Sequence, residues 1–328
     1  QGHAVAALTD KGHFFILPWH GYSLIGTTDT VYRGDPDAFR VTEKDISDFI
    51  DSINEAYPGA RLRRGDVLYF YGGLRPIVDQ TSNVPGDETE EKDSYHASRA
   101  AEIVDHEIEH GLPGIITAIG GKWTTARALA EQVVDLAVVK LGAEAVPCRS
   151  AETPVYGGDT GIFAEFLAQA REKFPAFPPD VVDHLSYNYG AGMVEVLRIA
   201  EERPDLRERI CEGLPNIAAE IPHAVRHEMA FSMEDILFRR TGIGAYGVPD
   251  ISVLDRIGAL AGEELEWSPD EIKAQRDRVQ LRYQPSSRAR AVVNPRSPAG
   301  KPGSAGPRFP AGWHRASVLL TRCIPTVP

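Results

Sequence analysis

Residue types that can bind an anion or an electron-rich ring occur together in one stretch, IGGKWTTAR at residues 119–127, between an apolar run and a helical pattern. The first N–H groups of a helix concentrate positive potential, and glycines let a ligand approach the backbone closely. A phosphate loop is excluded here, because Ile116 and Trp123 occupy two positions that its motif requires. We therefore predict a ligand-binding turn at a helix N-terminus. The alternative is a strand-to-helix turn whose glycines only permit the bend.

Two arginines have sequence contexts that suit the binding of a phosphate or a carboxylate. Arg75 follows a predicted strand and the pair Gly72-Gly73, and Pro76 biases its backbone toward an extended conformation. Its guanidinium could hold an anion through two parallel hydrogen bonds. Arg99 begins another predicted strand and is a second candidate. The alternatives are a surface salt bridge at Arg75 and a charged guard of an edge strand at Arg99.

Residues 106–110 match the zinc-protease pattern H-E-x-x-H, and Glu131 could be a third ligand. That chemistry needs both histidines one turn apart on a continuing helix. A Gly-Leu-Pro sequence follows at once and would end such a helix. We therefore expect a charged turn between two strands and no metal site. His223 and His227 have no acidic or thiol partner at ligand spacing and are expected to be structural.

The elements that must position these residues begin with short β-rich runs, and the first three predict an antiparallel meander. The strands are expected at residues 5–8, 14–19, 22–27, 67–71, 99–104 and 115–119. Thr42 and Asp45 form a capping box before an apolar series at helical spacing, Ile46, Phe49, Ile50 and Ile53. A long helix is expected from Trp123 to Leu141, with Ala128, Leu129, Val133, Leu136, Ala137 and Val139–Leu141 on its buried side.

From residue 158 onward the pattern becomes helical, with Pro and Gly between the helices. The helices are expected at 160–174, 179–187, 191–202, 222–239 and 268–282, after a domain boundary near 145–158. The tail, 284–328, holds eight prolines, seven Lys or Arg and no Asp or Glu. Such a segment buries too little apolar surface to offset its ordering entropy. We expect it to be disordered, so that limited proteolysis removes it without disturbing the rest.

Length and composition limit the classes of function. The 328 residues are enough for two domains with ordinary cores. A formal charge of −12 argues against nucleic acid as the main partner, which needs a basic face. The sequence has no apolar run long enough to cross a bilayer. Three scattered cysteines without a CxxC pair are typical of a reducing compartment, which favours a cytoplasmic location.

Several of these segments, taken in order, resemble one family, the FAD-dependent glycerol-3-phosphate dehydrogenases. The resemblance covers about residues 4–282. It rests on Phe15–Trp19, Leu24–Asp29 with the turn to Pro36, Tyr71–Pro76, Gly120–Arg127, Ala224–Ala230, Glu234–Leu237 and Arg239–Thr241.

The resemblance implies a reaction and a set of site residues. Enzymes of this family oxidise sn-glycerol 3-phosphate to dihydroxyacetone phosphate, pass a hydride to FAD and hand electrons to a quinone at a membrane surface. Arg75 would hold the substrate and Arg99 would help to neutralise its phosphate. Gly121, Lys122, Trp123 and Thr124 would lie against the flavin. The resemblance assigns no catalytic base in this sequence.

The implied fold is α+β: an antiparallel-sheet substrate or cap domain of a flavin oxidoreductase in residues 1–148, an all-α C-terminal domain in 149–283 and the tail. The family's N-terminal Gly-rich dinucleotide-binding segment is not found in the sequence, so the chain alone is expected to be inactive. Glycerol 3-phosphate, a quinone, a peripheral membrane surface and a second copy in a homodimer are the expected partners. A related flavin amine oxidase and a non-catalytic, truncated binding module are the alternatives.

Overall fold

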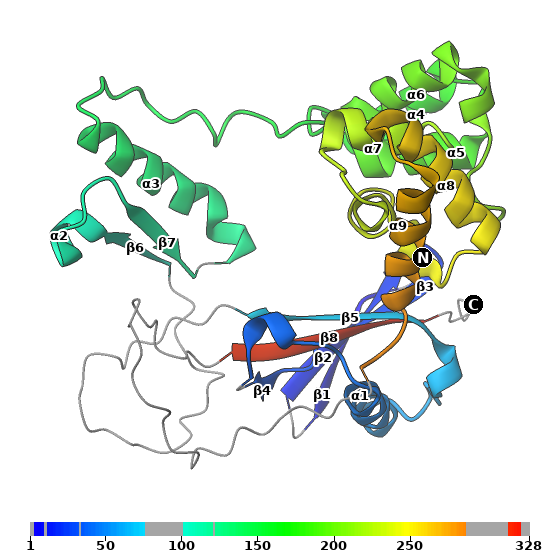
Figure 1. The fold of residues 1–328 in the computed structure, drawn as a ribbon, viewed down its shortest axis with the longest axis horizontal. Coiled ribbons are helices and arrows are strands. Elements are labelled where there is room, and N and C mark those ends of the chain that lie inside the picture. Colours follow the sequence, from blue (N-terminus) through cyan, green and yellow to red (C-terminus); the bar gives the residue numbers. More distant parts are fainter. Residues whose placement is uncertain are drawn as a thin grey trace.

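A computed structural model provides the fold and describes residues 3–9, 12–32, 34–75, 101–120, 122–286 and 314–322. The predicted meander is confirmed. Strands β1 (Val5–Thr9), β2 (Gly12–Trp19) and β3 (Tyr22–Gly26) pair antiparallel in sequence order. The three strands form one side of a six-stranded sheet, shown in blue in Figure 1.

A strand from the tail, β8 (His314–Arg322), completes this sheet. One edge of β8 pairs with β3 and then with β4 (Thr30–Tyr32), and its other edge pairs with β5 (Val67–Arg75). The expectation of a disordered tail is therefore not met at 314–322, because backbone pairing on both edges holds this segment. Residues 287–313 and 323–328 lie outside the described part of the chain.

One face of the sheet is covered by helix α1 (Glu43–Ala56), which begins as its sequence predicts. The Thr42 hydroxyl accepts a hydrogen bond from the Asp45 N–H, and an Asp45 carboxylate oxygen accepts one from the Thr42 N–H. This reciprocal cap satisfies donors that a helix start would otherwise leave open. The four predicted apolar residues of α1 are buried and pack with Phe14, Ile25 and Phe70 of the sheet.

A second unit contains the predicted ligand-binding turn. Strands β6 (Glu102–Asp105) and β7 (Ile116–Ile119) form a hairpin around helix α2 (His106–His110), and helix α3 (Ala126–Lys140) packs on β7. Lys140 binds Asp105 and Glu107 across this unit. Hydrogen bonds to these carboxylates raise the pKa of Lys140, and the bond from Lys140 lowers the pKa of Asp105.

Helix α3 does not bury the face that its sequence pattern predicts. None of its residues is buried; Val139 is 72% exposed, and Leu141, just beyond its end, is 81% exposed. The hairpin covers only part of the helix, because two short strands offer little surface (Figure 1). Helix α3 therefore has more apolar side chains than the described residues cover.

The C-terminal region is an all-α domain with its own core. Its helices are α4 (Phe163–Lys173), α5 (Pro179–Tyr189), α6 (Met193–Glu202), α7 (Glu220–Glu228), α8 (Ile251–Leu265) and α9 (Pro269–Leu281). The expected single helix at 222–239 is wrong. Met229 adopts a left-handed conformation that ends α7, and a π-helical segment, Asp235–Arg240, follows. Helix α8 was not predicted.

Aromatic side chains join the sheet to the helical domain. Tyr69 of β5 stacks on Phe238 with ring centroids 5.2 Å apart, and Trp19 of β2 stacks on Tyr246 at the same separation. Tyr69 and Trp19 lie on the sheet face opposite the one that packs on α1. Figure 1 shows the helical domain on that side of the sheet. Within the described residues, no helix combines the length and the apolar character needed to cross a membrane.

Candidate functional site

Strand β5 carries Arg75 to one end of the sheet. Alternation along the strand buries Phe70 against α1 and turns Tyr69 and Tyr71 to the opposite face. Arg75 is the last residue of β5, and its backbone pairs with Arg315 of β8. The prediction that Arg75 follows a strand and two glycines is therefore correct in outline, although both glycines lie inside the strand.

The sheet face opposite α1 is open beside this strand end. Phe15, Leu17 and Tyr71 on that face are 44%, 39% and 43% exposed. A Cβ placed on Gly73 would meet no atom within 4 Å. A flat ring could lie over this surface, since it offers apolar side chains next to a position without a side chain.

The turn after β7 has the predicted strand–glycine–helix form. Gly120 has a φ of +70°, a left-handed conformation that favours glycine. Lys122 precedes a 3₁₀ turn, Trp123–Thr125, that leads into α3. The Thr125 hydroxyl accepts a hydrogen bond from the Lys122 N–H at 3.2 Å, and the Thr125 N–H donates to the Lys122 carbonyl at 3.0 Å. The turn is thus fixed by its own residues.

Three of the predicted site residues, Lys122, Trp123 and Thr124, lie together in this turn and are exposed. Trp123 is 98% exposed, which leaves its whole ring available to a ligand or to another packing surface. Gly121 and Arg99 lie outside the described residues. The Ala126 N–H of α3 donates to the Trp123 carbonyl, so the open N–H end of the helix lies in the preceding 3₁₀ turn, where it favours an electron-rich ligand.

The H-E-x-x-H segment forms α2, a helix of five residues, within the hairpin. Gly111, with a φ of +66°, ends α2, so the glycine acts as expected. Nε2 of His106 lies 2.8 Å from the Thr117 hydroxyl, and Glu107 is paired with Lys140. Within the described part of the chain, no cluster of His, Cys, Asp or Glu has a geometry that could hold a metal ion.

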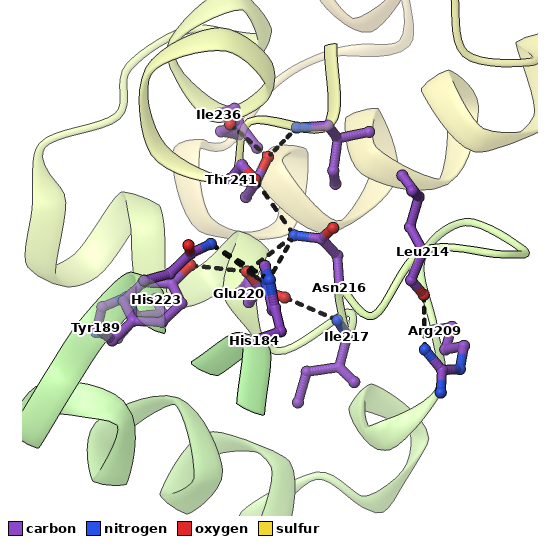
Figure 2. A network of polar contacts seen from close by, with 12 residues as sticks. His184, Tyr189, Arg209, Leu214, Asn216, Ile217, Glu220, His223, Ile236 and Thr241 are labelled. Carbon is purple, nitrogen blue, oxygen red and sulfur yellow. Dashed lines mark hydrogen bonds and ion pairs between the residues drawn. The ribbon is translucent and has the colours of Figure 1, made fainter. Parts of the chain in front are cut away.

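A buried polar network in the helical domain was not singled out from the sequence (Figure 2). Glu220 accepts hydrogen bonds from the Ile217 N–H and the Tyr189 hydroxyl, each at 2.8 Å, and from the Asn216 amide at 3.1 Å. Nε2 of His184 lies 3.0 Å from the same carboxylate. Burial raises the pKa of Tyr189 well above 10, which keeps its hydroxyl a donor.

The histidine pair that was expected to be structural adjoins this network. His223 has no exposed surface, and its ring lies 5.0 Å from that of His227. The pKa of His223 is lowered to about 4, mainly because the ring is buried and also because the neighbouring His227 repels a second positive charge. A neutral ring packed in the core is consistent with a structural role.

The dinucleotide fingerprint G-x-G-x-x-G also occurs at residues 242–247. The fingerprint works only where it joins a strand to a helix N-terminus. Here it follows the π-helical segment and contains a 3₁₀ turn, Ile243–Tyr246. This glycine series therefore shapes a loop and does not form a cradle for a pyrophosphate.

Comparison with protein families gives two matches along the chain. The FAD dependent oxidoreductase family matches residues 2–136, and the C-terminal domain of alpha-glycerophosphate oxidase matches residues 148–272. The first match contains strands β1 to β5 of the sheet and the turn at 119–125, but not β8. The second covers most of the helical domain.

Individual relatives agree with these matches. A glycerol-3-phosphate dehydrogenase of Synechocystis sp. is 35% identical over 73% of this chain and 41% of its own length. A probable mitochondrial glycerol-3-phosphate dehydrogenase of Dictyostelium discoideum is 32% identical over 79% of this chain and 39% of its own length. The chain thus spans about two fifths of these relatives.

A solved structure is similar in fold as well. The glycerol-3-phosphate dehydrogenase of Bacillus halodurans, complexed with FAD, superposes with a TM-score of 0.68 at 27% identity. The match covers 85% of this chain and 53% of that one. Together, the two family matches and these relatives show that the chain is similar, over most of its length, to the FAD-dependent glycerol-3-phosphate dehydrogenases.

Proposed function

We propose that this chain supplies the substrate-binding sheet and the flavin-contacting turn of an enzyme that oxidises sn-glycerol 3-phosphate to dihydroxyacetone phosphate. In this proposal residues 1–148 form the partial oxidoreductase unit and residues 149–283 the helical domain. The observation that carries the proposal is the open sheet face, which ends at Arg75, in a chain that also has the β7–Gly120–α3 turn.

FAD fits the residues that are present. The exposed row of Phe15, Leu17 and Tyr71 and the empty space above Gly73 suit a planar ring system. Gly121, Lys122, Trp123 and Thr124 would hold the ring, with the start of α3 favouring negative charge on it. When bound, FAD accepts the hydride that the substrate loses.

The residues of the chain itself bind and orient the substrate. Arg75 would hold the substrate and Arg99 would help to neutralise its phosphate, through charge-assisted hydrogen bonds. The N–H groups at the start of α3 are fixed before the reaction, so they would stabilise developing negative charge without reorganisation. Loss of one such donor typically costs about 3 kcal/mol.

The family resemblance also suggests the electron acceptor and the location of the enzyme in the cell. Electrons would pass to a quinone at the surface of the cytoplasmic membrane, where the enzyme would bind peripherally as a homodimer. The match of residues 148–272 to a glycerophosphate oxidase domain favours a glycerol phosphate substrate over an amine.

Equilibrium dialysis with labelled sn-glycerol 3-phosphate tests the binding role of the arginines. We expect Arg75→Gln and Arg99→Gln each to weaken binding by about tenfold or more, since a hydrogen bond to a charged group is lost. Arg64→Gln is the control, because Arg64 is an arginine paired at the surface with Glu43. Binding to Arg75→Gln that equals wild-type binding would remove Arg75 from the substrate site.

Dye reduction tests the expected inactivity of the chain alone. We expect no reduction of an artificial electron acceptor when the purified chain receives FAD and glycerol 3-phosphate. Turnover in this assay would show that the chain is a complete enzyme. That result would leave the roles of the arginines intact, because dialysis measures them separately.

A further inference from the structure

A pocket lies where the sheet meets the helical domain. Its volume is about 370 Å³, and its aromatic lining residues are Trp19, Tyr69, Tyr71 and Phe238. Two arginines, Arg239 and Arg282, also line it. Small-molecule sites commonly form at domain interfaces, and this volume is near their lower limit. The pocket therefore suits a compact ligand of one or two rings.

The walls of the pocket carry aromatic side chains from both domains, held in place by ring stacking. Tyr69 and Phe238 are stacked with an angle of 17° between their planes. Trp19 is held by its stack on Tyr246 at an angle of 25°. Such pre-positioned rings favour a planar aromatic ligand over an aliphatic one, since flat rings stack and lose little conformational freedom.

Two arginines form the polar end of the pocket, and each is paired with one carboxylate that does not line it. Nε of Arg282 lies 3.0 Å from a Glu234 oxygen, and Nη1 of Arg239 lies 2.7 Å from an Asp235 oxygen. A guanidinium has five N–H donors, so each of these contacts leaves donors available. The guanidinium carbon of Arg282 also lies 5.9 Å from the Phe238 ring centroid, which sets charge beside an aromatic face. No Asp or Glu is among the described residues that line the pocket.

We propose that this pocket binds a small aromatic carboxylate, with its ring between the aromatic walls and its carboxylate on Arg282. This site is separate from the proposed substrate site, because glycerol 3-phosphate has no ring to stack. It also goes beyond the proposed function, which assigns no ligand to the domain interface. Tyr71 belongs both to the pocket and to the open sheet face. A ligand in the pocket would therefore contact the surface that leads to Arg75.

Binding of 2-naphthoate to the full chain tests the proposal, with the free ligand measured by equilibrium dialysis. We expect saturable binding to one site, at least tenfold tighter than binding of 2-naphthylmethylamine, which reverses the charge. Cyclohexanecarboxylate, which keeps the charge without the aromatic ring, is also expected to bind at least tenfold more weakly. Equal binding of the three probes would overturn the proposal.

Two variants locate the site. Arg282→Gln removes the carboxylate partner and should weaken naphthoate binding about tenfold or more. Ala245→Leu adds volume to another lining residue and should weaken binding by a similar factor or abolish it. Arg278→Gln is the matched control, because Arg278 is a half-exposed, ion-paired arginine on α9, the helix that ends just before Arg282. Wild-type affinity in both pocket variants would place the naphthoate elsewhere, for instance on the exposed side of α3, and would refute the site.

Discussion

The carboxyl group of Glu220 has no exposed surface and accepts three hydrogen bonds from the helical domain. Glu220→Ala would leave the Ile217 N–H, the Tyr189 hydroxyl and the Asn216 amide without this acceptor. Breaking such a buried polar set typically costs about 3–5 kcal/mol. We therefore expect urea unfolding, followed by circular dichroism of the helices, to show a loss of this size.

The control for this prediction is Glu202→Ala on α6. Glu202 forms an exposed ion pair with Arg198, and such pairs contribute about 0–1 kcal/mol. If Glu220→Ala destabilised the domain no more than Glu202→Ala, the buried network would have no special part in stability.

Protonation of His223 links stability to pH. Its pKa in the folded protein is about 4, below the ordinary value of 6.5, mainly because the ring is buried. Between these values the unfolded chain binds a proton that the folded chain does not, so stability falls as the pH drops from about 6.5 to about 4. The titratable groups that face the ring are those of His227, Tyr189, Glu220, Glu195 and Glu228. A substitution of His223 alone leaves all of them in place.

His223→Leu removes this proton-binding site. We expect its free energy of unfolding, measured in urea at a series of pH values, to fall less steeply than that of the wild type between pH 6.5 and 4. Parallel curves for the two proteins would mean that His223 titrates normally.

At the scale of single residues, the sequence predicted sites formed by neighbouring residues better than sites formed by residues far apart in the chain. The turn at Gly120–Thr125 could be predicted, because its residue types and their order are contiguous. Glu220 could not be singled out, since its partners His184 and Tyr189 come from another helix and its own position carries no distinctive spacing. Where Arg75 and Arg99 meet the substrate stays a prediction.

Among the elements, β8 has a consequence for the proposed substrate site. Within the described residues, β5 is paired only with β8, so the strand that ends at Arg75 is held in the sheet by the tail. Proline cannot donate a hydrogen bond to a central strand. Leu320→Pro, at a position paired with both Ile25 and Phe70, should therefore detach β5 in part.

Hydrogen exchange of β5 amides is the measurement for this variant. We expect these amides to exchange at least tenfold faster in Leu320→Pro, with a matching loss of glycerol 3-phosphate affinity. Ala305→Pro, which changes the tail outside the paired segment, should behave as the wild type. Unchanged exchange in Leu320→Pro would show that β8 does not hold β5, and proteolysis of the tail would then be harmless, as its composition suggests.

Element prediction succeeded where local signals were strong. The capping box and apolar spacing of α1 specify both its start and its buried face. The break in the expected helix at 222–239 could not be seen, because Met229 is an ordinary helix former that here adopts a left-handed conformation. Strand β8 was missed because proline and charge dominate the composition of the tail, whereas a nine-residue segment within it finds pairing partners on both edges.

At the scale of the whole molecule, the family matches support an α+β flavin oxidoreductase fold. The sheet also includes a strand from the tail, which the prediction left out. The extent to which each unit buries its apolar side chains could not be predicted from the sequence. Helix α3 has an apolar pattern but no buried residue, since burial depends on what lies against a helix and not on its own periodicity.

The sheet and the helical domain have separate hydrophobic cores, joined mainly by stacked rings at their boundary. Cooperativity of unfolding normally extends only as far as a continuous core, and chains with several cores depart from all-or-none behaviour. On heating, this chain should absorb heat in at least two steps, with a calorimetric enthalpy larger than the van't Hoff value. No single melting temperature would then describe it, and a ligand seated at the boundary would bring the two steps closer together.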